Sequence, residues 1–231
     1  ASRMHDPRTL RRARGPSPHR IRNRVMGQVI ALDRMLSERR VWSPRTSAMP
    51  AAIAGECTGH DALDALLPQG GWPRRSLCEL LVPADGVGEV GLLAPLIARM
   101  TGACKPVVLV APPHVAYAPA WQAMGVDLRA LVVVQAQGRQ ALWAFEQCLR
   151  SAACAVVVGW PRDADARALR RLQVAADTGE CIGFAVRDRR HAVNPSPAPL
   201  RIEHVEGRWH VRKCRGAPVP AKAFDPVGGL Q

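Results

Sequence analysis

The chain has 231 residues, of which 48% are hydrophobic, and this is enough for one sizeable core and one main domain. No run of 18 or more apolar residues occurs, so no membrane-spanning helix is predicted. The arginine-rich N-terminus has no apolar stretch of the kind that a secretory signal needs. The formal net charge is +13, and it is unevenly distributed along the chain.

Residues 1–25 carry eight arginines and one aspartate, so they supply +7 of the net charge. They show no hydrophobic periodicity and are predicted to be disordered. One interpretation is that translation starts at Met26 and that this segment lies upstream of the true start. The other is that it forms a basic arm that binds nucleic acid.

Seven cysteines are scattered along the chain, at positions 57, 78, 104, 148, 154, 181 and 214. None belongs to a C-x-x-C pair and the number is odd, so neither a zinc site nor a disulfide framework is predicted. We expect reduced, mostly buried thiols, no metal site and no cofactor, in a cytoplasmic protein.

The first predicted elements precede the core. Residues 26–40 place apolar side chains at helical spacing, and residues 43–56 are rich in Pro, Ala and Ser. We therefore expect an N-terminal helix and linker over residues 26–56. A core of residues 57–214 and a flexible, extended tail of residues 215–231 follow.

The core is predicted to open with a short helix and a buried strand. Thr58 is expected to cap a helix over residues 63–67, which ends at Pro68 and the glycine pair after it. Residues 76–81 form a buried strand, and a glycine-bearing turn joins them to a helix over residues 92–100.

The rest of the core alternates apolar strands with helices. Strands are predicted at 105–112, 131–135, 154–160 and 181–188, and helices at 116–125, 140–153 and 163–180. Asp163 or Asp165 is expected to cap the last helix. Residues 199–214 are predicted to form a β-hairpin that turns at residues 206–207. Continuous apolar strands between helices indicate an α/β doubly wound fold with a mainly parallel sheet flanked by helices.

The stretch ELLVPADGVGEVGLL has the strand–turn–helix layout of a phosphate-binding P-loop, G-x-x-x-x-G-K-[ST]. Gly86 and Gly88 supply tight turning, but Glu89 and Val90 occupy the positions of the lysine and the hydroxyl, and Pro83 lies near the position of the first glycine. A carboxylate beside a triphosphate is repulsive by about 1–4 kcal/mol. At a helix N-terminus it is favourable by about 0.3–1 kcal/mol, so we expect Glu89 to act as a tethered anion in the loop.

The entry to the core, CTGHDALDALLPQGGWPRRSLCELLVP, resembles the RecA recombinase core. It matches a "xxLDxxL" helix and the motif G-x-P-x-G-x-hydrophobic-x-E, with Arg75 at the second glycine. The resemblance continues through HVAYAPAWQAMGVDLRALVVVQAQGRQALWAFEQCL. Residues 26–231 as a whole are similar to the ImuA family of RecA-like, SulA-like proteins, on the stretches GWPRRSLCELLVP, GVGEVGLLAPLIARM, APPHVAYAPAW and ADARALRRLQVAA.

The resemblance implies three catalytic positions, and all three are lost here. Besides the loop, Pro113 stands where RecA-type ATPases carry the glutamate that orients water, and Gly159 stands where they carry the aspartate that supports Mg²⁺. We therefore expect a pseudo-ATPase rather than an enzyme. A nucleotide-dependent enzyme would need a substitute carboxylate, and the candidates are Asp163, Asp165 and Asp85.

With catalysis lost, the basic surface is the remaining candidate for function. The helix from Asp163 carries a basic face, and the regions that correspond to the DNA-binding loops of RecA, 162–166 and 189–198, are short. The side chains proposed to contact DNA phosphate or an acidic partner are Arg162, Arg167, Arg170, Arg171, Arg187, Arg189, Arg190, Arg212, Lys213 and Arg215. The tail residues Val219, Phe224 and Leu230 are further candidates to dock on a partner.

The family resemblance implies a role in damage-induced (SOS) mutagenic translesion synthesis. The partners it implies are ImuB, the error-prone DNA polymerase III alpha subunit, directly or through ImuB, and RecA. Binding to DNA is expected to be weak, and location at the nucleoid is expected during the damage response. The alternative is a SulA-like inhibitor of cell division that acts on FtsZ.

Overall fold

The computed structural model describes residues 54–226, so the expectations for the basic segment, the N-terminal helix, most of the linker and Leu230 lie outside the described residues. The seven strands are β1 (Ser76–Val82), β2 (Val107–Val110), β3 (Leu131–Val134), β4 (Val156–Gly159), β5 (Ile182–Asp188), β6 (Leu200–Val205) and β7 (Arg208–Cys214). The helices are α2 (Asp61–Asp64), α3 (Glu89–Gly102), α4 (Ala118–Ala123), α5 (Gly138–Arg150) and α6 (Ala166–Thr178), with short 3-10 helices η1 (Leu128–Ala130) and η2 (Arg189–Val193).

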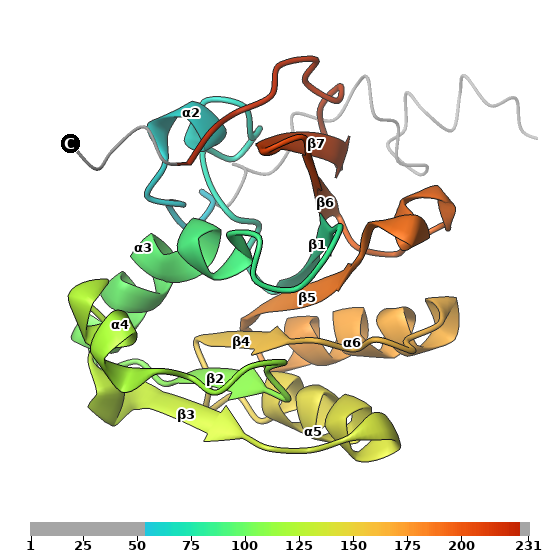
Figure 1. Cartoon of the computed structure of the whole chain (residues 1–231). Coiled ribbons are helices and arrows are strands. Elements are labelled where there is room, and N and C mark those ends of the chain that lie inside the picture. The colour runs from blue at the N-terminus through green and yellow to red at the C-terminus, as the bar shows by residue number, and fades with distance from the viewer. Residues whose placement is uncertain (1–53, 227–231) are drawn as a thin grey trace, which may run out of the picture. The chain divides into compact units, whose positions relative to one another are not determined.

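The strands form one mixed sheet in the order β3-β2-β4-β5-β1-β6-β7 (Figure 1). Every pairing is parallel except the β6–β7 hairpin, which is antiparallel. The α/β class, the mainly parallel sheet and the C-terminal hairpin are thereby confirmed. Parallel strands end at the same edge of the sheet, so the loops after β1, β2, β4 and β5 share that edge.

Two apolar layers cover the two faces of the sheet. Alternate residues of β1 enter different clusters: Cys78 and Leu80 pack with the buried face of α3, whereas Leu77 packs with α5 and α6. Figure 1 shows α5 and α6 side by side, on the side of the sheet opposite to α3. Both faces of β1 are buried along its whole length, which agrees with a sequence that is apolar apart from Ser76 and Glu79.

Four local predictions were wrong. Thr58 does not cap α2, because its hydroxyl bonds with the backbone of His60 in a turn, and α2 has no side-chain cap. The helix after the glycine turn begins at Glu89, three residues before the predicted start. The strand β3 was predicted to be buried, but Val132 and Val133 are 47% and 37% exposed, because β3 is an edge strand with β2 as its one neighbour.

The fourth correction concerns the tail. Phe224 is buried in the core of its own chain, and its backbone N–H and C=O both bond to Trp209 of β7, with N···O distances of 2.9 and 3.0 Å. The tail is therefore anchored at this point and does not offer Phe224 to a partner. Val219 is half exposed. Within residues 54–226, no helix is long and apolar enough to cross a membrane.

Candidate functional site

The turn between β1 and α3 places two glycines with left-handed backbone angles directly before a helix. Gly86 and Gly88 have φ angles of +79° and +109°, the left-handed region in which a side chain is strained. Gly88 is also the N-cap of α3 and has no side chain with which to cap the helix. The free N–H groups of this first turn would therefore attract an anion.

The anion is supplied by the chain itself. Glu89 is 2% exposed, and its Oε1 accepts a hydrogen bond from the backbone N–H of Gly86 at 2.9 Å. Its Oε2 is buried without a partner among the described residues. A loop donor that would bind phosphate in a P-loop is thus already engaged, as the sequence led us to expect for a tethered carboxylate.

An ion pair ties the same loop to the end of β4. Asp85 Oδ2 lies 2.6 Å from Arg162 Nη2, and this contact crosses the strand β5 that separates β1 from β4 in the sheet. Arg162 was predicted to contact DNA or a partner. Its side chain is 66% exposed, so it remains accessible although it is paired.

The structure gives a physical reason for the glycine at the end of β4. A Cβ added to Gly159 would lie 2.8 Å from Cδ1 of Phe145, which packs from α5 onto the strand. An aspartate at this position would therefore displace the ring. Pro113 follows β2 in the loop at the same edge of the sheet and is half buried.

The three substitute carboxylates are not gathered. Asp165 caps α6 by accepting from the N–H of Ala168 at 2.7 Å, which confirms one of the two predicted caps. Asp163 is exposed, and Asp85 is held by Arg162. Within residues 54–226, no group of three His, Cys, Asp or Glu side chains is placed to hold a metal ion.

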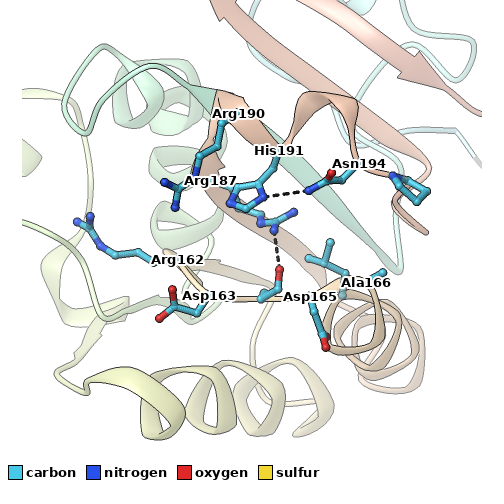
Figure 2. Close-up of a pocket in the computed structure, with 11 residues that line it drawn as sticks. Arg162, Asp163, Asp165, Ala166, Arg187, Arg190, His191 and Asn194 are labelled. Atoms are coloured by element: carbon cyan, nitrogen blue, oxygen red, sulfur yellow. Dashed lines mark hydrogen bonds between the residues drawn. The ribbon is translucent and has the colours of Figure 1, made fainter.

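A cavity of about 440 Å³ lies between the β4–α6 loop and η2, and Figure 2 shows its lining. Arg162, Asp163 and Asp165 reach it from one loop, and Arg190, His191 and Asn194 from the other. These two loops correspond to the short regions 162–166 and 189–198. The two loops identified from the sequence therefore line the same cavity. The buried ionic side chains that support these loops were not predicted.

Glu79 of β1 is fully buried between two arginines. Its Oε1 lies 2.7 Å from Nη1 of Arg187 on β5, and its Oε2 lies 2.7 Å from Nε of Arg201 on β6. The side chains of the two arginines are 3% and 8% exposed. Arg187 was predicted to contact DNA or a partner at the surface, and this was wrong: β5 lies between two strands and is buried on both faces as far as Arg187, where Glu79 compensates its charge.

Each arginine also holds one loop of the cavity. Arg187 Nη2 donates to the carbonyl of Ala164 at 2.6 Å (Figure 2). Arg201 donates to three carbonyls of the other loop, those of His191, Ala192 and Asn194. One buried carboxylate therefore positions both loops through its two partners. The signal in the sequence was the presence of Glu79, Arg187 and Arg201 at buried positions of three neighbouring strands.

His191 is under the influence of these charges. Burial, followed by the positive charges of Arg187 and Arg190, lowers the pKa of its imidazole, and Asp188 and Glu79 oppose this effect. Its Nδ1 is 3.2 Å from the amide nitrogen of Asn194. The lowered pKa favours the neutral form of the imidazole.

The other predicted basic residues are scattered over several elements. Arg171 on α6 pairs with Glu146 of α5 at 3.2 Å, Arg212 pairs with Glu203 at 2.9 Å, and Lys213 donates to the carbonyl of Ser196 at 2.7 Å. Arg190 lies 3.7 Å from Asp188. The exposed side chains without a carboxylate within 4.0 Å in the described part of the chain include Arg167, Arg170, Arg189 and Arg215. The structure thus gathers Arg162, Arg187 and Arg190 at one cavity and leaves Arg212, Lys213 and Arg215 near the hairpin.

Comparison with known proteins adds little to this geometry. No protein-family model matches the chain, and no curated protein matches it. Among solved structures, SulA from Pseudomonas aeruginosa is similar to it with a TM-score of 0.42 and 23% identity, over 48% of this chain and 96% of that chain. A likeness of this degree carries no functional argument.

Proposed function

We propose that this chain is a RecA-like protein without ATPase activity that serves as an accessory factor in damage-induced mutagenic translesion DNA synthesis. In this proposal it binds ImuB, and through ImuB or directly the error-prone DNA polymerase III alpha subunit, and it engages RecA. It acts in the cytoplasm, at the nucleoid during the damage response. The alternative action on FtsZ has no observation of its own in its favour.

The observation that carries the proposal is the hydrogen bond from Gly86 N–H to the buried Glu89 carboxylate. A nucleotide phosphate would have to displace a carboxylate that the backbone fixes within the loop, and like charges would oppose it. The loss of carboxylates at Pro113 and Gly159 agrees with this, since Phe145 fills the space beside Gly159. A protein built in this way works by binding other macromolecules.

The backbone at Arg75 supports the RecA-like part of the proposal. The resemblance places a glycine of the motif G-x-P-x-G-x-hydrophobic-x-E at this position, and Arg75 has a φ angle of +53°. A non-glycine residue in the left-handed region is uncommon, so a backbone angle that favours glycine occurs where the resemblance places a glycine. Arg75 is held there by Asp177 at 3.3 Å and Glu180 at 3.0 Å.

The test is the frequency of damage-induced mutation in a strain that lacks the gene, with the full chain or residues 26–231 supplied back. We expect the frequency to fall on deletion and to return with either form. An unchanged frequency would refute the role in translesion synthesis, and filamentous growth on overexpression without DNA damage would favour the action on FtsZ. Binding of Mg-ATP by the purified chain at micromolar concentration would refute the claim that Glu89 prevents a nucleotide from binding in the β1–α3 turn.

A further inference from the structure

A second cavity lies at the same edge of the sheet, beside the two lost acidic positions. It has a volume of about 540 Å³, within the usual range for ligand sites, and lies at the ends of β2 and β4 and the start of α5. Its walls are mainly apolar and include Pro112, Pro113, Ala136, Leu142, Trp160 and Pro161. Where a RecA-type ATPase would carry carboxylates, this chain therefore presents an apolar hollow.

The polar groups at this cavity are mostly donors. Arg139 and Arg162 line it; Arg162 is already paired with Asp85 at 2.6 Å, whereas Arg139 has no carboxylate within 4.0 Å in the described part of the chain. The cavity lies at the N-terminus of α5, where the N-cap residue Gln137 makes no side-chain cap. Trp160 forms part of the wall and is 6% exposed, and its indole N–H has no acceptor among the described residues. Asp163 is the one carboxylate among the lining residues of this cavity, all of which lie within residues 54–226. The site therefore favours an apolar group that carries hydrogen-bond acceptors or negative charge.

Exposed apolar side chains continue from this cavity along both elements that bound it. Val115 and Tyr117, just after Pro113, are 89% and 68% exposed, and Trp143, one helical turn beyond Arg139, is 65% exposed. Clusters of exposed aromatic and aliphatic side chains next to arginines are typical of protein interaction sites. A small metabolite would leave these side chains uncovered.

We propose that this cavity docks an acidic segment of a partner protein, with one large apolar side chain inserted between Pro113, Leu142 and Trp160 and a carboxylate on Arg139, next to the Asp85–Arg162 ion pair. The inference rests on the proposed function, since it names the face by which a protein without ATPase activity would act. The docking proposal does not depend on which protein is the partner.

The charge of the chain decides among possible occupants. Residues 1–53 contain twelve arginines and three acidic residues, so the chain's own N-terminal segment would be repelled by the rim arginines. A second copy that docked through the same face would bring like charges together. With a net charge of +13, the protein is complementary to an acidic partner.

The experiment uses the purified full chain and four labelled probes, followed by fluorescence polarisation. The first is a peptide with a Leu-Phe pair flanked by Asp and Glu; the second keeps the acids and replaces the pair with Gly-Ser. The third keeps the pair and replaces the acids with Asn and Gln, and the fourth is a short oligothymidylate. We expect the first peptide to bind at least about tenfold more tightly than the other two peptides, and its binding to weaken as salt is raised.

Two variants locate the site. Arg139→Glu reverses a rim charge while placing a favourable acid in the first turn of α5, so the fold is preserved, and Ala141→Phe fills the cavity. Each variant is expected to bind the first peptide about tenfold or more weakly than the parent does. The matched control is Arg208→Glu. Arg208 is exposed on β7, an outer strand that four other strands separate from β2, so this variant should bind the first peptide as the parent does.

The indole N–H signal of Trp160 in NMR gives a second readout, since it should shift with the first peptide and not with the second. No binding of the first peptide at millimolar concentration, or equal binding by Arg139→Glu and the parent, would overturn the proposal. Preferential binding of oligothymidylate that Arg139→Glu abolishes would assign the face to nucleic acid and also overturn it. None of these results would alter the mutation frequencies that test the proposed function.

Discussion

The buried carboxylate of Glu79 provides the sharpest quantitative test of this structure. It is fully buried, and its two oxygens each lie 2.7 Å from a buried guanidinium. Glu79→Gln keeps the shape of the side chain and removes its charge. Arg187 and Arg201 would then be two buried cations without a counter-ion.

Breaking a buried ion pair by neutralising one partner costs about 3–5 kcal/mol, because the charge that remains is not compensated. For a domain of this size, such a loss lowers Tm by roughly 6–20 °C. The assay is urea unfolding at neutral pH followed by circular dichroism. Glu206→Gln is the control, since Glu206 is exposed in the β6–β7 turn and the change there should stay within about 0.5 kcal/mol.

Hydrogen exchange tests the second half of the argument. Arg187 and Arg201 hold the carbonyls of residues 164, 191, 192 and 194, so Glu79→Gln should increase exchange in both cavity loops more than in α3. A loss of less than about 1 kcal/mol would refute the reasoning, because it would mean that the arginines are solvated well enough to do without the carboxylate. Destabilisation with unchanged relative exchange in the loops would refute the positioning role alone.

The remaining predictions concern single positions. Glu89→Lys should not create Mg-ATP binding, and it should lower the free energy of unfolding by about 1–3 kcal/mol, because it removes the acceptor of Gly86 N–H and buries an ammonium; isothermal calorimetry and urea unfolding measure both. Gly159→Asp should lower the free energy of unfolding by at least about 3 kcal/mol, since its Cβ would meet the Phe145 ring, and it should not create Mg²⁺ binding. Arg75→Ala should be about 1 kcal/mol less stable than Arg75→Gly, because both lose the same ion pairs and only alanine is strained at a φ of +53°. In the native protein iodoacetamide should modify Cys57 and Cys104, which are exposed, well before Cys78 and Cys181, because burial raises the pKa of both buried thiols, to about 12 for Cys181; mass spectrometry of the digest measures this.

The order of strands and helices was predictable from the sequence because it depends on the period of apolar residues. All seven strands and the four longer helices of the described part were found, with errors at their ends. What periodicity does not contain is the position of a strand within the sheet. An apolar run such as LVVV is expected to be buried on both sides, and the exposure of Val132 and Val133 follows only from the sheet order that leaves β3 at an edge.

The seven cysteines show the same limit. They were predicted to be mostly buried because most lie in apolar runs, but Cys78 and Cys181 alone are fully buried, Cys57 and Cys104 are exposed, and the other three are half buried. All seven are free thiols. Burial of a small side chain depends on which face of its element it occupies, and near the end of an element the sequence does not fix this.

The residue types that differ from a nucleotide site could be recognised in the sequence. The contacts made by the residues that stand in their place could not. A missing lysine or aspartate can be seen in the sequence, whereas the roles of Glu89 and Gly159 depend on what packs beside them. Glu89 replaces an external anion with an internal one, and Gly159 leaves room for the ring of Phe145. Under the proposed function, both residues favour the stability of the resting fold over an open nucleotide site.

Buried charge links the loops at this edge of the sheet to one another. In the described part of the chain, Glu79 connects β1 to both loops of the first cavity through Arg187 and Arg201, and the Asp85–Arg162 pair connects the β1–α3 turn to the end of β4. These contacts cross from β1 to β4, β5 and β6 at the edge where a bound ligand would otherwise join the loops. The β4–α6 loop lines both cavities, so the part of the proposed docking face that this loop forms is held in place and loses little conformational entropy when a partner binds.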